Sequence, residues 1–232
     1  MKILITSGGT REYIDDVRVL TNISSGKLGA MIAEKFIKTE RINKTGYHKR
    51  SMIYKTPLDI TYICSKGSET PNHSIYDKVT LCEVTDVKSV YDTMERLVPE
   101  MDVIIHCMAV SDFGFEPCST KLKSNDPEAF IDSLRDRIYQ TPKILSMIKK
   151  WNPNCKLISF KFEVGLLHDD LIKIATESGL KNDCDLVIAN DKKEMIDNHS
   201  HIAYAININN DKISRLSDKE DISKFIFNYI NG

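Results

Sequence analysis

The sequence predicts an α/β protein built on a doubly wound, mainly parallel sheet, with helices on both faces and a C-terminal β-hairpin. Short apolar runs alternate with helix-like segments along most of the 232 residues, a pattern typical of parallel strands joined by helices. Residues 103–110 (VIIHCMAV) are nearly all apolar, as expected for a strand buried on both faces. Two strand-like runs flank residues 209–211 and predict the hairpin.

The expected elements follow from hydrophobic periodicity and from turn residues. Strands are expected at residues 2–6, 59–65, 78–84, 103–110, 156–162, 185–189, 202–208 and 212–216. Helices are expected after residues 24–25, at 86–100, from 141, at 168–181 and at 217–230. Residues 112–140 are expected to be irregular, and Pro142 to occupy the first turn of the helix that follows. We expect one domain over residues 1–232.

Composition excludes several classes of protein. Lys and Arg total 32 against 33 Asp and Glu, so the net charge of −1 argues against a nucleic-acid or membrane partner. No apolar run approaches the roughly 20 residues of a membrane helix, and the start MKILITSGG is no signal peptide, so we expect a cytoplasmic protein. The six cysteines form no CxxC pair, which favours core thiols over a zinc site.

A glycine pair follows the first expected strand. Gly8 and Gly9 allow backbone amides to approach an anion closely, and Ser7 and Thr10 add hydroxyl donors. The segment is neither GxGxxG nor a Walker loop. A simple tight turn explains it equally well.

A polar cluster stands where the next helix begins. It contains Arg18, Asn22, Ser24, Ser25, Gly26 and Lys27. The amides of a helix N-terminus favour phosphate or carboxylate, so the cluster predicts an anion site, with an ordinary helix cap as the alternative.

Three further places carry polar groups beyond apolar runs. Asp112 follows the most apolar run and can orient a ligand or hold Mg²⁺, while Lys121 and Lys123 follow as either phosphate-closing or solvent lysines. Asn190-Asp191 ends another expected strand, as a ligand contact or as a helix cap. The basic stretch at 38–58 is either a surface insertion or a phosphate-attracting flap.

An ordered set of motifs spans nearly the whole chain. The set comprises SGGTREYIDDVR (7–18), TNISSGKLG (21–29), HCMAVSDF (106–113), KLK (121–123), TPKI (141–144), FKFE (160–163) and GLKNDCDLVIAND (179–191). Together they resemble phosphopantothenate–cysteine ligase of the DNA/pantothenate metabolism flavoprotein family. The chain is similar to the stand-alone ligase rather than to the form fused to a flavin-dependent decarboxylase, so no flavin is expected.

The resemblance implies a Rossmann-like fold and a two-step ligation. The carboxylate of 4′-phosphopantothenate attacks the α-phosphorus of a nucleotide and releases pyrophosphate. The amine of cysteine then attacks the acyl-nucleotide, giving phosphopantothenoylcysteine and the nucleoside monophosphate. The resemblance implies CTP, with ATP as the alternative, together with Mg²⁺ and a homodimer with shared active sites.

The resemblance also assigns roles to residues. Asn22 is expected to contact the acyl-nucleotide, Arg18 to contact substrate, and Lys121 to serve the first step as the lysine of an active-site loop at 112–140. Phosphate binding falls to Gly8, Gly9, Ser24, Ser25, Gly26 and Lys27. The other nucleotide positions are Asp112, Thr141, Pro142, Lys143, Ile144, Phe160 and Lys181.

The chain departs from the family pattern in a few places. Glu177 stands where relatives often carry a basic residue, and Ile23 replaces a common histidine. Lys123 remains an alternative to Lys121 because the loop varies in length among relatives.

Two rival functions stay open. An NAD(P)-dependent reductase would use the same fold, but the GxGxxG motif and a Tyr-x-x-x-Lys pair are both missing. A non-catalytic nucleotide-binding protein would bind the nucleotide without releasing pyrophosphate.

Overall fold

The protein is built on one eight-stranded sheet in the order β12-β11-β10-β9-β6-β1-β4-β5. The structure, a computed structural model, describes residues 1–45, 58–72, 79–118 and 126–232, with only the backbone described for 39–45. The strands are β1 (Lys2–Ser7), β4 (Asp59–Ser65), β5 (Val79–Val84), β6 (Val103–His106), β9 (Lys156–Glu163), β10 (Leu186–Asp191), β11 (Ala203–Asn207) and β12 (Ile213–Leu216). Neighbours from β5 to β10 are parallel, and β10–β11–β12 are antiparallel. The predicted Rossmann-like sheet and its C-terminal hairpin are therefore confirmed.

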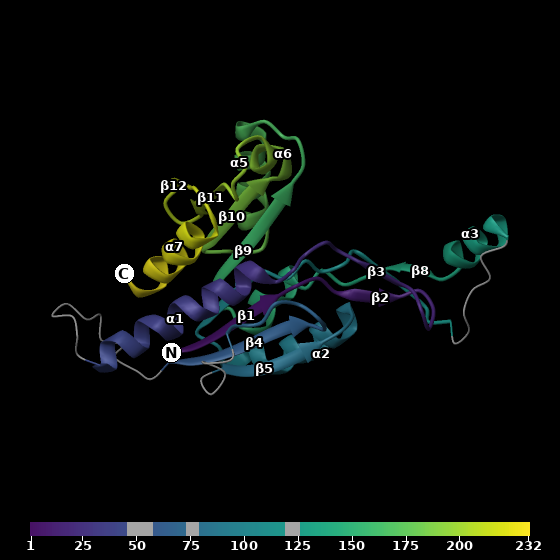
Figure 1. The fold of residues 1–232 in the computed structure, drawn as a ribbon, viewed down its shortest axis with the longest axis horizontal. Coiled ribbons are helices and arrows are strands. Elements are labelled where there is room, and N and C mark those ends of the chain that lie inside the picture. The colour runs from purple at the N-terminus through teal and green to yellow at the C-terminus, as the bar shows by residue number, and fades with distance from the viewer. Residues whose placement is uncertain (46–57, 73–78, 119–125) are drawn as a thin grey trace.

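Helices cover both faces of the sheet (Figure 1). They are α1 (Lys27–Thr45), α2 (Val87–Leu97) with the 3₁₀ turn η2 (Val98–Glu100), α4 (Leu145–Trp151), α5 (His168–Lys181), α6 (Lys192–Asp197) and α7 (Lys219–Asn231). Side chains of β1 alternate between two cores: Leu4 packs with α2, α4 and α5, whereas Ile3 and Ile5 pack with α1 and α7. All three side chains are fully buried, which explains why a central parallel strand reads as a continuous apolar run.

Two narrow ribbons leave the carboxyl edge of the sheet side by side and end at α3 (Figure 1). One pairs β2 (Arg11–Tyr13) with β3 (Val19–Thr21), and the other pairs β7 (Phe113–Phe115) with β8 (Ile138–Gln140). The helix α3 (Pro127–Arg135) lies between β7 and β8 in the chain. The prediction of an irregular segment at 112–140 was wrong for these residues, because strands of three residues are too short to display an alternation of polar and apolar side chains.

Two predicted boundaries also need correction. β6 ends at His106 rather than at residue 110, because the chain turns toward β1, where Ala109 N donates to Gly8 O at 2.8 Å. α4 begins at Leu145, so Pro142 lies before the helix and not in its first turn. Thr141 is held in an extended connection instead, with its N–H donating to Asp112 O at 3.0 Å.

The other sequence expectations divide between confirmed and undescribed. Cys64, Cys155 and Cys184 are buried thiols, as expected of core cysteines. Of the basic stretch, residues 38–45 continue α1 and 46–57 lie outside the described residues. Among the helices that the structure describes, none combines the length and hydropathy needed to cross a bilayer.

Candidate functional site at the carboxyl edge of the sheet

The site lies at the point in the sheet where the strand order reverses. β1 and β6 are neighbours, yet the chain leaves β1 toward β4 on one side and leaves β6 toward β9 on the other. Connections that diverge in this way leave a crevice outside the carboxyl ends of the two strands, where open α/β sheets bind ligands. The glycine pair follows β1 at this point, and Ala109 follows β6 beside it, in a parallel bridge with Gly9.

The glycine pair makes room for the loops that meet at this edge. A Cβ atom on Gly9 would lie 2.6 Å from the backbone oxygen of Asn22. Gly8 has a φ of +85°, and a Cβ there would lie 2.4 Å from Ser65 Oγ and 2.0 Å from Ser68 Oγ. A larger residue at position 9 would push the loop of Asn22 away from the strand end, and one at position 8 would displace Ser65 and Ser68. Both glycines are therefore needed for close approach and not only for the turn.

The N-terminus of α1 faces the same edge. Ser25 Oγ accepts from Lys27 N at 3.3 Å, and Ser7 Oγ donates to the oxygen of Gly26 at 2.9 Å, which anchors the turn on the end of β1. The first turn of α1 carries no acidic residue. Ser25 and Lys27 are exposed and Ser24 is half-buried, so this helix start presents its dipole and a cation to solvent, as an anion site requires.

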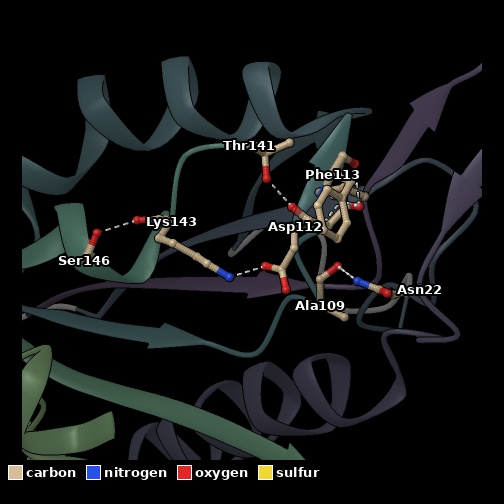
Figure 2. Close-up of polar contacts among 9 residues, drawn as sticks. Asn22, Ala109, Asp112, Phe113, Thr141, Lys143 and Ser146 are labelled. Carbon is tan, nitrogen blue, oxygen red and sulfur yellow. Dashed lines mark hydrogen bonds and ion pairs between the residues drawn. The ribbon is translucent and has the colours of Figure 1, made fainter. Parts of the chain in front are cut away.

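Asn22 reaches from the α1 loop to the bend after β6. Its Nδ2 donates to Ala109 O at 3.2 Å, and Figure 2 shows the side chain pointing at that carbonyl. The same oxygen accepts from Thr10 N at 3.2 Å. Asn22 Oδ1 has no hydrogen-bond partner within the described part of the chain, so it remains available to a ligand.

Asp112 and Lys143 form an ion pair across the mouth of a pocket (Figure 2). The pocket residue Ser111 is fixed through both of its backbone polar groups: its N–H donates to Thr10 Oγ1 at 2.9 Å, and its carbonyl accepts from Thr141 Oγ1 at 2.5 Å. The pocket has a volume of about 90 Å³ and is lined by His106, Val110, Ser111, Asp112, Pro142, Lys143, Ile144 and Leu145. Pockets that enclose a whole ligand are several times larger, so this one fits only part of a nucleotide.

Comparison with known proteins identifies the family. The chain matches the model of the DNA/pantothenate metabolism flavoprotein C-terminal domain over residues 1–41 and 44–232. The protein belongs to this family.

Its relatives are proteins of coenzyme A synthesis. The chain is 31% identical over 198 residues to the coenzyme A biosynthesis bifunctional protein CoaBC of Thermococcus kodakarensis, covering 83% of this chain and 41% of the relative. The corresponding protein of Methanocaldococcus jannaschii is 31% identical over 190 residues, covering 82% and 40%. The chain therefore spans about two fifths of the length of these curated relatives.

Solved structures share the whole fold. The DNA/pantothenate metabolism flavoprotein of Streptococcus pneumoniae superposes with a TM-score of 0.75 at 30% identity, covering 99% of this chain and 98% of that one. A mutant of Cab2 in complex with phosphopantothenate-cysteine has a TM-score of 0.70 at 17% identity, covering 98% and 85%. The second likeness shows the fold alone.

The structure brings most of the residues expected from the family motifs to one edge of the sheet. Gly8, Gly9, Asn22 and the 24–27 turn lie on one side of Ala109, and Asp112 with residues 141–144 lies on the other. Segments that are far apart in the sequence thus meet at the switch point. Lys121 and Lys123 lie outside the described residues.

Arg18, Phe160 and Lys181 are not brought to the pocket. Arg18 lies in the ribbon, paired with Asp15 at 2.5 Å and stacked 5.5 Å from the ring centre of Phe130. Phe160 packs against the core on the α1 and α7 face, opposite the face on which Ile144 packs. Lys181 ends α5 beside the amino end of β10, at the opposite edge of the sheet.

Asn190-Asp191 matches its alternative interpretation as a cap. Asp191 Oδ1 accepts from Lys193 N at 2.8 Å and from Glu194 N at 3.2 Å, at the start of α6. Its Oδ2 accepts from Leu166 N at 3.0 Å. The carboxylate is therefore used to hold a helix start and a loop rather than to meet a ligand.

His106 is a pocket residue that sequence reasoning missed. It is the last residue of β6, is buried, and places Nδ1 2.8 Å from Thr6 Oγ1. Burial lowers the pKa of His106 to about 4, so the ring is neutral at pH 7. The available signal was a histidine inside the nearly apolar run VIIHCMAV.

Proposed function

We propose that the protein is a phosphopantothenate–cysteine ligase, which joins 4′-phosphopantothenate to L-cysteine through an acyl-nucleotide in coenzyme A synthesis. The observation that carries the proposal is the meeting of three family motifs at Ala109, whose oxygen accepts from Asn22 and whose N–H donates to Gly8. The names of the curated relatives, which function in coenzyme A biosynthesis, support the same assignment.

The first step needs an anion site and a nearby cation. The carboxylate of phosphopantothenate attacks the α-phosphorus, the bond to the bridging oxygen breaks, and pyrophosphate leaves. The exposed start of α1 beside the glycine pair offers amides and Lys27 to phosphate groups. Lys121, which follows β7 in the sequence, would neutralise charge that develops as pyrophosphate leaves.

The second step needs the mixed anhydride to be held in place. The amine of cysteine attacks the acyl carbon, the nucleoside monophosphate leaves, and the amine loses a proton. Asn22 can serve here because its Nδ2 is braced on Ala109 while its Oδ1 remains available. A braced side chain loses little freedom when the intermediate binds.

We infer that the pocket beside Asp112 takes the nucleoside end of the nucleotide. Its lining includes Val110, Pro142, Ile144 and Leu145, which suit a flat ring better than a phosphate. We favour CTP and keep ATP as the alternative.

Magnesium is expected to bind mainly through the triphosphate. Among the described residues, no group of three His, Cys, Asp or Glu side chains forms a site for a metal ion. Asp112 offers one carboxylate, which is already paired with Lys143. Mg²⁺ commonly binds through one or two carboxylates plus substrate phosphates, so Asp112 would supply at most one ligand.

We propose that the ribbons pair two copies of the chain and that Arg18 serves the partner's site. The ribbons and α3 expose several large apolar side chains, namely Tyr13, Val17, Val19, Leu20, Phe113, Ile131, Ile138 and Tyr139. Apolar groups on a thin projection cannot be buried by their own chain, and a second copy would cover them. This arrangement would also give a substrate-contacting role to Arg18, which lies away from the pocket of its own chain.

The test is product formation by the purified protein. Mass spectrometry should detect phosphopantothenoylcysteine when phosphopantothenate, cysteine, Mg²⁺ and CTP are all present, and a parallel reaction with ATP decides the nucleotide. If no product forms with CTP and none forms with ATP, the proposal is contradicted. Tight binding of NADPH, followed by its fluorescence, would favour the reductase, and nucleotide binding without pyrophosphate release would favour the non-catalytic protein.

A further inference from the structure

His106 sits between a buried hydroxyl and the pocket. Alternation along β6 places Ile105 in the core with α1 and α7, and Ile104 in the core with α2, α4 and α5. His106 therefore faces the α4 side, as the pocket residue Ile144 does. Its Nδ1 lies 2.8 Å from Oγ1 of Thr6, a residue with no exposed surface.

The second ring nitrogen of His106 opens on the pocket. Nε2 has no hydrogen-bond partner among the described residues. The only buried side-chain nitrogen or oxygen left unpaired in that part of the chain is Nη2 of Arg137. Nε2 is therefore not sealed in the interior but reaches solvent, and the open space that His106 lines is the pocket.

The hydrogen bonds around Thr6 decide which nitrogen carries the proton. Thr6 Oγ1 accepts from Met108 N at 3.2 Å. If it also accepted from His106 Nδ1, its own hydroxyl hydrogen would be buried without an acceptor, which is costly. The arrangement that satisfies every group runs from Met108 N–H to Thr6, from the Thr6 hydroxyl to Nδ1, and leaves the hydrogen of the neutral ring on Nε2.

We propose that His106 donates a hydrogen bond from Nε2 to an acceptor atom on the nucleobase and thereby contributes to nucleotide selection. A phosphate would meet apolar walls and the carboxylate of Asp112, and the one cation of the lining, Lys143, is already paired with that carboxylate. A base, in contrast, meets apolar walls with its faces and a neutral donor with its edge. Cytosine and adenine both carry ring acceptors. The inference rests on the proposed function, because it takes the nucleotide as the ligand of this pocket.

Nitrogen NMR of the protein labelled with ¹⁵N-histidine tests the proposal directly. The spectrum of the free protein should show a neutral His106 ring with its hydrogen on Nε2, and Thr6→Val should populate the other tautomer. Titration with CTP or ATP should shift the Nε2 signal. Ribose 5-phosphate and phosphopantothenate, which lack a base, should leave it unchanged.

Kinetics supply the second measurement. His106→Phe should raise the KM for the nucleotide about 3- to 10-fold with little change in kcat, as expected for one lost neutral hydrogen bond. His106→Gln keeps an amide donor and should recover part of the loss. If the Nε2 signal of the wild-type protein does not shift when CTP or ATP is added, or shifts with phosphopantothenate instead, the inference is overturned. If the wild-type protein still forms phosphopantothenoylcysteine in that case, the proposed function is supported although the inference about His106 is wrong. If it forms no product, the proposed function itself is contradicted.

Discussion

The sheet and the ribbons differ in how far their apolar side chains are buried. In the sheet, Ile3, Leu4 and Ile5 are fully buried between two layers of helices. In the ribbons, each strand has three residues, and Leu20 and Ile138 are 40% and 47% exposed. The sheet is stabilised by burial within the chain, whereas the ribbons need other contacts to keep their shape.

Those contacts are polar and lie at both ends of the ribbons, one set beside α3 and one beside the sheet. Arg137 Nη1 donates to Ile14 O and to Glu116 O, both at 2.9 Å, which ties one ribbon to the other. Glu12 Oε1 accepts from Val87 N at 2.9 Å and anchors β2 on the start of α2. The comparison shows that the site lies where the buried sheet ends and the exposed ribbons begin.

The largest expected effect is on the sheet. Ile104→Ala removes a fully buried side chain from β6 and should lower the free energy of unfolding by about 2–5 kcal/mol. Ile138→Ala in the ribbon should change it by less than about 0.5 kcal/mol when measured at low protein concentration. Urea unfolding gives both values, and similar losses would break the distinction between the two regions.

Substitution of Lys121 should affect the reaction rate without affecting folding. Lys121→Ala should slow pyrophosphate release about 100-fold, the usual effect of removing one charge-stabilising donor. Urea unfolding should be unchanged. Lys123→Ala is the matched control, and a defect in Lys123→Ala without one in Lys121→Ala would move the assigned role by two residues.

A charge on the ribbon should separate the two copies. Ile138→Asp places a carboxylate among exposed apolar side chains, so the proposed homodimer should dissociate while the monomer keeps its stability. Light scattering measures the mass. Lys88→Asp, on the exposed surface of α2, is the control; a wild-type protein that is already monomeric would refute the dimer.

Asn22→Asp should separate the two chemical steps. The carboxylate keeps the shape, loses the donor to Ala109 and repels phosphate, so the acyl-nucleotide should form but react poorly with cysteine. Quenched reactions with labelled nucleotide measure the trapped intermediate. An equal loss of both steps with no trapped intermediate would mean that Asn22 only braces the turn.

The smallest expected effect concerns the contact of Glu12 with Val87 N. Burial raises the pKa of Glu12 above its ordinary value of 4.5, although the hydrogen bond from Val87 N opposes the shift. The native state therefore holds this proton more tightly than the unfolded chain, and stability falls as pH rises from 4.5 through the folded pKa. Glu12→Gln keeps an acceptor for Val87 N and should remove this loss, giving a small gain at pH 7.

The gain from Glu12→Gln should disappear when unfolding is measured below pH 4. If the difference in unfolding free energy between Glu12→Gln and the wild type does not depend on pH, the pKa of Glu12 is not raised in the folded protein. This measurement tests whether the contact is held by shape and hydrogen bonding rather than by charge.

The sequence predicted the sheet because strands that are buried on both faces are apolar along most of their length, as in 103–105 and 186–189. The ribbons left no such trace, since strands of three residues with one exposed face have no readable period. Asp112 and Asn22 could be named as candidates because, within the family motifs, Asp112 follows an apolar run and Asn22 precedes a helix start. His106 could not, because its role depends on Thr6, which only the pairing of β1 with β6 brings beside it.

The measurement that tests the central claim most directly is pyrophosphate release by the wild-type protein without cysteine. With phosphopantothenate, Mg²⁺ and the preferred nucleotide, rapid mixing should give a burst of about one pyrophosphate per active site, because the carboxylate is activated before the amine arrives and the acyl-nucleotide stays bound. Adding cysteine should convert the burst into continuous turnover. Release that strictly requires cysteine, or that proceeds without phosphopantothenate, would contradict the account.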